Sequence, residues 1–439
     1  MEPVKVGLLG LGTVGGGTVT VLARSGAEIA RRAGRGISIV QASARDISKS
    51  RNCDTSGIAL TTDPFAVVNN PEIQIVAELI GGDTLARQLV MQAIENGKHV
   101  VTANKALIAK HGNEIFAAAQ AKGVMVAFEA AVAGGIPIIK AIREGLTGNQ
   151  IQWLAGIING TGNFILTEMR DKGREFADVL AEAQALGYAE ADPTFDVEGI
   201  DAAHKLTILA SIAFGIPLQF EKVFTEGISR ITREDVSNAT ELGYRIKHLG
   251  IARRTGKGVE LRVHPTLIPH RRLIANVDGV MNAVLVNGDA VGPTLYYGAG
   301  AGAEPTASAV VADLVDVTRT LTSDPENRVP HLAFQPDALK DMPILGMDDV
   351  ETAYYLRLQA LDKPGVLADI TRVLADQGIS IEALIQKEPE EENSSAVSVI
   401  MLTHRVPERA MKQAIQRIQA LDAITGDVVQ IRMEQLSSK

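Results

Sequence analysis

The sequence is poor in cysteine, in basic runs and in long apolar runs, and each shortage excludes a class of protein. Cys53 is the one cysteine, so the chain forms no intramolecular disulfide and no multi-cysteine metal site. The formal net charge is -9 without a long basic run, which argues against nucleic acid as a partner. No apolar run approaches the roughly 18 residues that span a bilayer, and no signal-peptide pattern is present. We therefore expect a cytoplasmic protein that does not bind a membrane.

The 439 residues divide into four stretches with different patterns. Over 1–130, short apolar runs alternate with helix-like stretches, which predicts a Rossmann-like, doubly wound parallel sheet in an α/β protein. Over 131–323, long helical stretches precede β-rich pieces, which predicts an α+β domain. The stretch 324–350 carries four prolines and reads as a linker. The stretch 351–435 has the order βαββαβ of a ferredoxin-like domain, with the acidic run Glu388 to Glu392 as a solvated hairpin loop.

The stretch "GLLGLGTVGGG", residues 7 to 17, follows the first strand pattern and opens into a helix pattern. It contains a G-x-G-x-x-G motif made of Gly10, Gly12 and Gly15. Residues without a Cβ allow a tight turn and let the backbone approach a pyrophosphate, which the free N–H groups at a helix N-terminus then bind. The motif therefore predicts a dinucleotide site. The alternative is that the glycines only allow a tight turn between strand and helix.

The end of the second predicted strand bears on which dinucleotide is bound. Arg45 follows that strand where NAD-binding folds usually place an acid, and Lys49 and Arg51 come soon after. A cation there suits the 2′-phosphate of NADP, so we expect NADP. Asp46 leaves NAD open, and the three cations also fit a solvated loop.

The most informative polar residues lie in the stretch 186–210. Asp201 and Lys205 are four residues apart and share one face of a strongly apolar helix. Burial lowers the pKa of a lysine toward the range useful for proton transfer, so Lys205 is a candidate acid, while an ordinary salt bridge is the alternative. Neighbouring carboxylates would bind the amino group of an amino-acid substrate.

Three further stretches lie where ligands bind in such folds. Lys105 follows the carboxyl end of a predicted parallel strand. The glycine-rich bend over 128–137 is able to face a ligand or cation, and the glycine-rich loop in 296–314 runs into a helix that is able to face an anion. Each of these also fits an ordinary solvated lysine or tight turn.

Several motifs together resemble homoserine dehydrogenase over residues 4 to about 320, and the tail over about 353 to 432 resembles an ACT domain. The motifs are "GLLGLGTVG", "ELIGG", "VTANKALIA", "FEAAVAGGIPIIK", "NGTGNFIL", "GYAEADPTFDVEGIDAAHKLTILA" and "GAGAGAEPTASAVVADL", with "LDKPGVLADITRVLADQGISI" in the tail. The resemblance implies reversible reduction of L-aspartate 4-semialdehyde to L-homoserine with NAD(P)H, in the pathway to threonine, isoleucine and methionine.

The resemblance also implies roles for individual residues. Lys205 matches the proton donor and Lys105 a lysine near cofactor and substrate, and the substrate contacts match Glu190 and Asp201. The cofactor contacts match Thr13, Val14, Gly187, Glu190 and Gly302. A structural sodium ion matches Glu129, Val132, Gly134 and Ile136, mainly through backbone oxygens.

The regulatory and quaternary expectations rest on the same resemblance. It implies an amino-acid effector, L-threonine, at the ACT domain, and a homodimer or homotetramer with dimerisation through the central domain. Two alternatives stay open: a catalytically silent amino-acid sensor that kept the fold, and a dehydrogenase of another small semialdehyde. The intact pair of Asp201 and Lys205 argues against the silent sensor.

Overall fold

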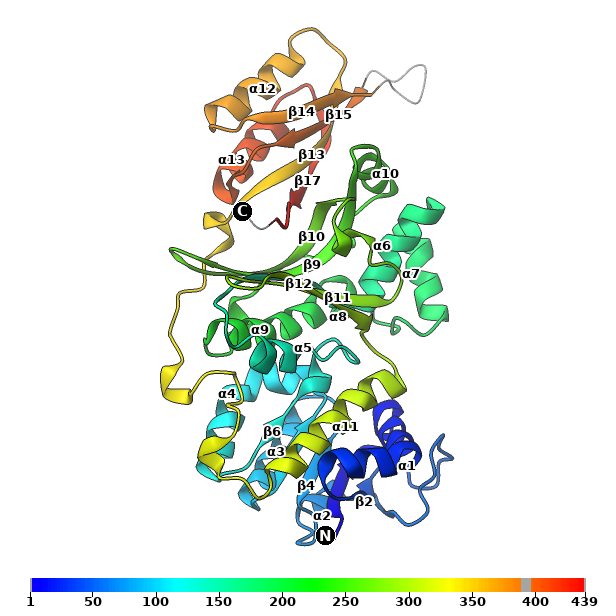
Figure 1. The fold of residues 1–439 in the computed structure, drawn as a ribbon. Coiled ribbons are helices and arrows are strands. Elements are labelled where there is room, and N and C mark those ends of the chain that lie inside the picture. The colour runs from blue at the N-terminus through cyan, green and yellow to red at the C-terminus, as the bar shows by residue number, and fades with distance from the viewer. Residues whose placement is uncertain (1, 388–395, 438–439) are drawn as a thin grey trace. The chain divides into compact units, whose positions relative to one another are not determined.

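The computed structural model describes residues 2–387 and 396–437, in two compact units that each combine separate stretches of the chain (Figure 1). Unit 1 comprises Met1–Gly160, Asp201–Val223 and Val280–Met342, and unit 2 comprises Thr161–Ile200, Phe224–Gly279 and Pro343–Lys439. The predicted acidic loop Glu388 to Glu392 lies outside the described residues. Among those described, no helix is both long enough and apolar enough to cross a membrane.

Unit 1 contains the expected parallel sheet, which confirms the α/β class. Its six strands follow the order β3-β2-β1-β4-β5-β6, and every adjacent pair is parallel. The strands are β1 (Val4–Leu9), β2 (Ile37–Ser43), β3 (Ala59–Thr61), β4 (Ile75–Glu78), β5 (His99–Thr102) and β6 (Val126–Ala127). The helices between them are α1 (Thr13–Ala33), α2 (Pro64–Val68), α3 (Thr84–Glu95) and α4 (Lys105–Ala121).

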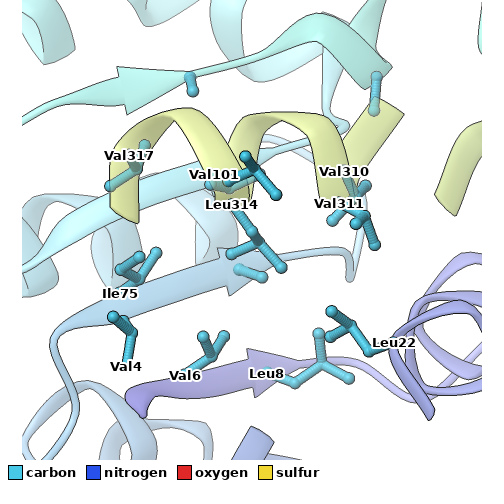
Figure 2. Close-up of a cluster of buried hydrophobic side chains, with 14 of the residues drawn as sticks. Val4, Val6, Leu8, Leu22, Ile75, Val101, Val310, Val311, Leu314 and Val317 are labelled. Atoms are coloured by element: carbon cyan, nitrogen blue, oxygen red, sulfur yellow. The ribbon is translucent and has the colours of Figure 1, made fainter. Parts of the chain in front are cut away.

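Both faces of this sheet are buried, as continuous apolar strands require. On one face, α1 and α11 (Ala303–Thr320) cover a cluster of aliphatic side chains, and Figure 2 shows Leu314 of α11 above the strands that carry Val6 and Ile75. On the other face, the side chains of Leu9 and Val76 are buried as well, and α2 and α3 pack against the strands. The strands of this sheet are therefore held by packing on both sides.

Helix α11 packs against the parallel sheet, although many residues separate it from β6, the last strand of that sheet. A Cβ on Gly17 would stand 2.5 Å from the carbonyl oxygen of Ala303, so α1 and α11 meet at a point where only glycine fits. Because of this packing, the compact units do not coincide with the contiguous stretches 1–130 and 131–323.

The rest of unit 1 surrounds an antiparallel group of strands in the order β12-β11-β7. The strands are β7 (Ile151–Ile157), β11 (Met281–Gly288) and β12 (Gly292–Ala299). The helical segments are η1 (Glu129–Ala131), α5 (Ile138–Lys140), η2 (Ala141–Gly145), α9 (Ile200–Phe214) and η3 (Phe220–Lys222), followed after α11 by the short turns η5 (Pro325–Asn327) and η6 (Pro336–Ala338).

Unit 2 contains the expected βαββαβ order, with a short extra strand. Its main strands follow the order β9-β10-β17-β13-β15-β14, in which β10 and β17 are parallel. They are β9 (Tyr244–Thr255), β10 (Gly258–Pro269), β13 (Glu351–Leu361), β14 (Ile381–Gln386), β15 (Ala396–Thr403) and β17 (Ile424–Met433), with β8 (Phe224–Thr225) beside β10 and β16 (Val406–Pro407) beside β13. The helices are α6 (Gly160–Lys172), α7 (Phe176–Ala185), α8 (Thr194–Val197), α10 (Arg233–Glu241), α12 (Val366–Asp376) and α13 (Glu408–Gln419), with the turns η4 (Leu273–Asn276) and η7 (Met347–Asp349).

The sheet of the C-terminal portion is buried on both faces. Along β13, Tyr354, Leu356 and Leu358 belong to a cluster formed with α12 and α13. Tyr355, between them, belongs to a second cluster with α6, α7 and α10. Since successive strand residues point to opposite faces, the C-terminal portion shares a core with earlier elements of unit 2.

Replacing Leu314 by alanine tests the packing of α11. Leu314 is fully buried, so we expect Leu314→Ala to lower the free energy of unfolding by about 2–5 kcal/mol through lost burial and a cavity. The control Val291→Ala removes an exposed side chain in the turn after β11 and should change stability by less than about 0.5 kcal/mol. Urea unfolding measures both, and equal values would contradict the packing.

Candidate functional site

A cavity of about 1020 Å³ lies at the carboxyl ends of β1, β2 and β4. Ligands bind outside this edge in open parallel sheets. The cavity wall includes Gly10 after β1, Ser43 at the end of β2 and Leu79 after β4, together with Ala303 at the start of α11. The first turns of α1 and α11 both reach it, which brings the partial positive charge of two helix N-termini to one cavity.

The glycine motif forms the turn between β1 and α1. Gly10 has φ +97°, a left-handed conformation that favours glycine, and a Cβ on Gly15 would stand 2.1 Å from the carbonyl oxygen of Gly10. Gly12 is the N-cap of α1 and forms no side-chain capping hydrogen bond, and a Cβ there would meet nothing within 4 Å. The turn therefore leaves open space beside the first N–H groups of α1, an arrangement that fits a pyrophosphate.

Three cationic side chains line the cavity, those of Arg45, Lys49 and Arg51, and they differ in their hydrogen-bond partners. Arg51 donates a hydrogen bond to the carbonyl oxygen of Leu11 (2.9 Å) and another to that of Asp46, so it braces the loop. Within residues 2–387 and 396–437, the exposed side chains of Arg45 and Lys49 have no such partner. These two cations remain available to an anionic group on a dinucleotide.

The acid at this wall is held by its own loop. A carboxylate oxygen of Asp46 accepts hydrogen bonds from the Ser48 hydroxyl (2.6 Å) and the Ser48 backbone N–H (2.9 Å). These bonds lower the pKa of Asp46, which keeps it charged. One oxygen of Asp46 is thus engaged within its own loop, while Asp46 and Arg45 both line the cavity.

A second group of charges gathers around Asp201, in the first turn of α9. The Lys205 ammonium lies 2.6 Å from Oδ2 of Asp201, and the Lys105 ammonium lies 3.0 Å from Oδ1. Asn159 also donates to Oδ2 (2.9 Å), and Lys205 donates to the carbonyl oxygen of Ile158 (2.7 Å). The structure thus brings together three of the residues singled out from the sequence.

The environment fixes the charge of this group. Burial alone would raise the pKa of Asp201, but the ammonium groups of Lys205 and Lys105 and the hydrogen bonds from Lys205 and Asn159 hold that pKa below its ordinary value. Asp201 and Lys205 are nearly enclosed, whereas the Lys105 side chain is 35% exposed. One carboxylate therefore orients two cations, of which Lys105 is the more accessible.

Lys105 reaches this group because α4 begins directly after β5. Asn104 is the N-cap of α4 and accepts a hydrogen bond from the backbone N–H of Leu107 (3.1 Å). Its amide also donates to the carbonyl oxygen of Gly82, in the loop after β4. The cap thereby fixes both the first turn of α4 and the neighbouring loop.

Glu78, at the end of β4, is a polar residue that the sequence reasoning missed. Its carboxylate is fully buried and accepts hydrogen bonds from the Thr102 hydroxyl (2.6 Å) and from the backbone N–H of Ile80 (2.9 Å), which lines the cavity. The pKa of Glu78 is raised by burial. An acid at the end of the apolar run "IVAE" was the available signal. Asn159 begins the motif "NGTGNFIL" quoted above, but no role was inferred for its side chain from the sequence.

Comparisons with known proteins agree along the whole chain. Family models for the homoserine dehydrogenase NAD-binding domain, homoserine dehydrogenase and the ACT domain match residues 10–129, 137–315 and 354–423. A homoserine dehydrogenase of Pseudomonas aeruginosa is 70% identical, with 100% of both chains covered. The chain belongs to the homoserine dehydrogenase family. It is therefore an NAD(P)-dependent oxidoreductase with homoserine dehydrogenase activity, and it has an ACT domain in its C-terminal portion.

Further relatives agree in sequence and fold. A homoserine dehydrogenase of Neisseria gonorrhoeae is 57% identical over 99% of this chain and 100% of its own. The crystal structure of a homoserine dehydrogenase from Thiobacillus denitrificans matches with a TM-score of 0.95 and 71% identity over 100% of this chain and 99% of that one. A hyperthermophilic archaeal homoserine dehydrogenase in complex with NADPH matches with a TM-score of 0.61 and 25% identity over 72% of this chain and 98% of that one.

The bend expected to hold sodium follows β6. Ala133 (φ 55°) and Gly134 (φ 49°) are consecutive left-handed residues, and the Glu129 carboxylate accepts hydrogen bonds from the backbone N–H groups of Ile139 and Lys140, both at 2.9 Å. Among the described residues, no group of three His, Cys, Asp or Glu side chains is placed to hold a metal. The role of this bend in binding sodium stays a prediction.

The remaining predicted contacts lie in different units. Gly302 is the N-cap of α11 with φ +119°, next to Ala303 at the cavity. Gly187 (φ +76°) and Glu190 belong to unit 2, in the exposed turn after α7, where the side chain of Gln184 donates to the carbonyl oxygen of Glu190 (3.0 Å). The roles of Gly187 and Glu190 stay predictions.

The glycine turn is tested by a single added methyl group. We expect Gly15→Ala to weaken NADPH binding at least about tenfold, roughly 1.4 kcal/mol, because the new Cβ forces the turn open. Gly26→Ala is the matched control in the same helix, since a Cβ there meets nothing within 4 Å. Fluorescence titration with NADPH gives both dissociation constants, and equal affinities in the two variants would refute the assignment of the turn.

Proposed function

We propose that this chain interconverts L-aspartate 4-semialdehyde and L-homoserine with NADP(H), and that Lys205 supplies the proton to the substrate oxygen. The observation that carries this proposal is the Asp201 carboxylate held between the Lys205 and Lys105 ammonium groups. A carbonyl oxygen that gains negative charge needs such preorganised cations beside it.

Lys205 has the better fixed position of the two lysines. Its hydrogen bonds to Asp201 and to the carbonyl oxygen of Ile158 hold the ammonium in one orientation. In the reducing direction this ammonium stabilises the alkoxide that develops on the substrate and then protonates it; in the oxidising direction the amine takes the proton back. Burial makes the interaction stronger than it would be in water.

Lys105 and Asp201 support that step in different ways. Lys105 is partly exposed at the start of α4 and adds a second positive charge close to the same carboxylate. Asp201 orients both lysines, since each of its oxygens is already engaged. The resemblance to homoserine dehydrogenase assigns the substrate's α-ammonium to Glu190 and Asp201, and both assignments belong to this proposal.

The residues of the cavity after β1 would hold the dinucleotide, which supplies the hydride when bound. The turn at Gly10, Gly12 and Gly15, with Thr13 and Val14 in the first turn of α1, would bind the pyrophosphate. Arg45 would pair with the 2′-phosphate, which makes NADP the preferred form. The archaeal relative solved with NADPH supports that preference.

Three finer assignments complete the proposal. A sodium ion would bind the bend at Glu129, Val132, Gly134 and Ile136 and stabilise it. L-Threonine would bind the ACT portion as the feedback effector. The chain would assemble as a homodimer or homotetramer.

Lys205→Ala tests the proton donor. We expect the turnover number for NADPH oxidation with L-aspartate 4-semialdehyde, followed at 340 nm, to fall at least about a hundredfold, as for a lost general acid. Lys122→Ala removes an exposed lysine paired with Glu95 and should match the wild type. Turnover that survives Lys205→Ala would move the donor to Lys105, and a wild type inactive with this substrate and both coenzymes would overturn the substrate assignment.

Arg45→Ala tests the coenzyme preference. Losing the cation should lower kcat/KM for NADPH about tenfold and leave kcat/KM for NADH unchanged, because only NADPH carries the 2′-phosphate. Arg31→Ala, which removes an exposed arginine paired with Glu28 on α1, serves as the control. Equal losses with the two coenzymes would refute the role of Arg45.

A further inference from the structure

Arg432, on the last strand β17, is a buried cation between two acids of unit 2. It is 1% exposed, and its Nε donates to Oε2 of Glu408 (2.9 Å), the first residue of α13. Its Nη1 lies 2.8 Å from Oε2 of Glu226, just after β8. The guanidinium also stacks over the ring of Phe224 at 5.0 Å. One side chain therefore joins the ACT portion to the segment that begins at Phe224.

The segment after β8 is held by its backbone as well. The N–H of Glu226 donates to the carbonyl oxygen of Val263 (2.8 Å), and His248 forms a hydrogen bond with the carbonyl oxygen of Glu226 (2.9 Å). Two residues on, the N–H of Ile228 donates to the carbonyl oxygen of Val197 (2.9 Å). The position of Glu226 is thus coupled to the stretch that immediately precedes α9.

The stretch that precedes α9 is tightly packed at Gly199. Gly199 has φ +82°, and a Cβ there would meet His248 and Val263 at 3.0 Å and Thr225 at 3.1 Å. In addition, the Ser229 hydroxyl donates to a carboxylate oxygen of Glu198 (2.7 Å). Helix α9 begins at the residue after Gly199, so this packing sets where its first turn starts.

We propose that Arg432 is a positioning residue for catalysis, acting through Glu226 on the entry into α9. The chain runs from the clamped Gly199 directly into the turn that carries Asp201, with Lys205 one turn later. This inference rests on the proposed roles of Asp201 and Lys205. The connection it proposes runs along the chain itself, from Gly199 into the first turn of α9, and does not depend on which effector binds.

Glu226 is the member of this group that is best suited to substitution. Its side chain is 35% exposed, whereas that of Glu408 is fully buried, and Arg432 keeps Glu408 as a partner when Glu226 is changed. The hydrogen bonds of Glu226 to Val263 and His248 use backbone atoms and survive the change. Substituting Glu226 therefore removes the ion pair with Arg432, while the backbone bonds and the stacking of Arg432 on Phe224 remain and no buried charge is left unpaired.

The test compares Glu226→Ala with the matched control Glu241→Ala. Glu241 also pairs with the ACT portion, through Lys387, but it lies at the end of α10, away from the stretch before α9. We expect Glu226→Ala to lower kcat for L-homoserine oxidation about fivefold or more, since a 1 Å misplacement of reacting groups costs up to about a hundredfold. The Kd for NADPH and the Tm should stay at the values of the control, and Glu226→Gln, which keeps an acceptor oxygen, should recover part of kcat.

A kcat for Glu226→Ala equal to that of Glu241→Ala would overturn the proposal, as would a loss matched by weaker NADPH binding and a lower Tm. Lys205→Ala, measured in the same series, separates this failure from that of the proposed function. If Lys205→Ala is inactive while Glu226→Ala is normal, only the positioning role fails. If Lys205→Ala is fully active, the assigned proton donor fails, whatever the result for Glu226.

Discussion

The ion pairs of Asp201 are the constraint around which the site is built. One carboxylate and two ammonium groups leave a net positive charge in a largely enclosed place, which is the charge that a developing alkoxide needs. The two lysines reach the carboxylate from different parts of unit 1, Lys205 from α9 and Lys105 from the start of α4. A shift of either helix would separate a charge from its partner, so the chemistry proposed for this group depends on the packing of unit 1.

The parts of this arrangement that are local in sequence could be predicted from the sequence. Gly10, Gly12 and Gly15 lie within six positions of one another, and Asp201 and Lys205 are one helical turn apart. The contact between Lys105 and Asp201, the hydrogen bond from Asn159 and the return of α11 to the parallel sheet are long-range. Periodicity describes which residues share a face of one element; it does not describe which elements meet.

The ACT portion is less independent than its regular βαββαβ pattern indicates. One face of its sheet forms an ordinary core with α12 and α13, but the other is buried against α6, α7 and α10. That second core includes Ala189, beside the predicted substrate residue Glu190, and Val197 in α8. An effector bound to this portion would therefore act on elements with which the portion already shares side-chain packing.

The place of β17 at the end of the chain also determines when unit 2 is completed during synthesis. Helices α6, α7 and α10 are finished by residue 241, but the apolar cluster that they form is completed only when Ile431 and Met433 of β17 have been added. At about 5–20 residues per second, the nascent chain carries this incomplete core for on the order of ten seconds or more. A chain released before β17 is made would thus lack two buried members of this cluster, which exposes apolar side chains to aggregation and proteolysis.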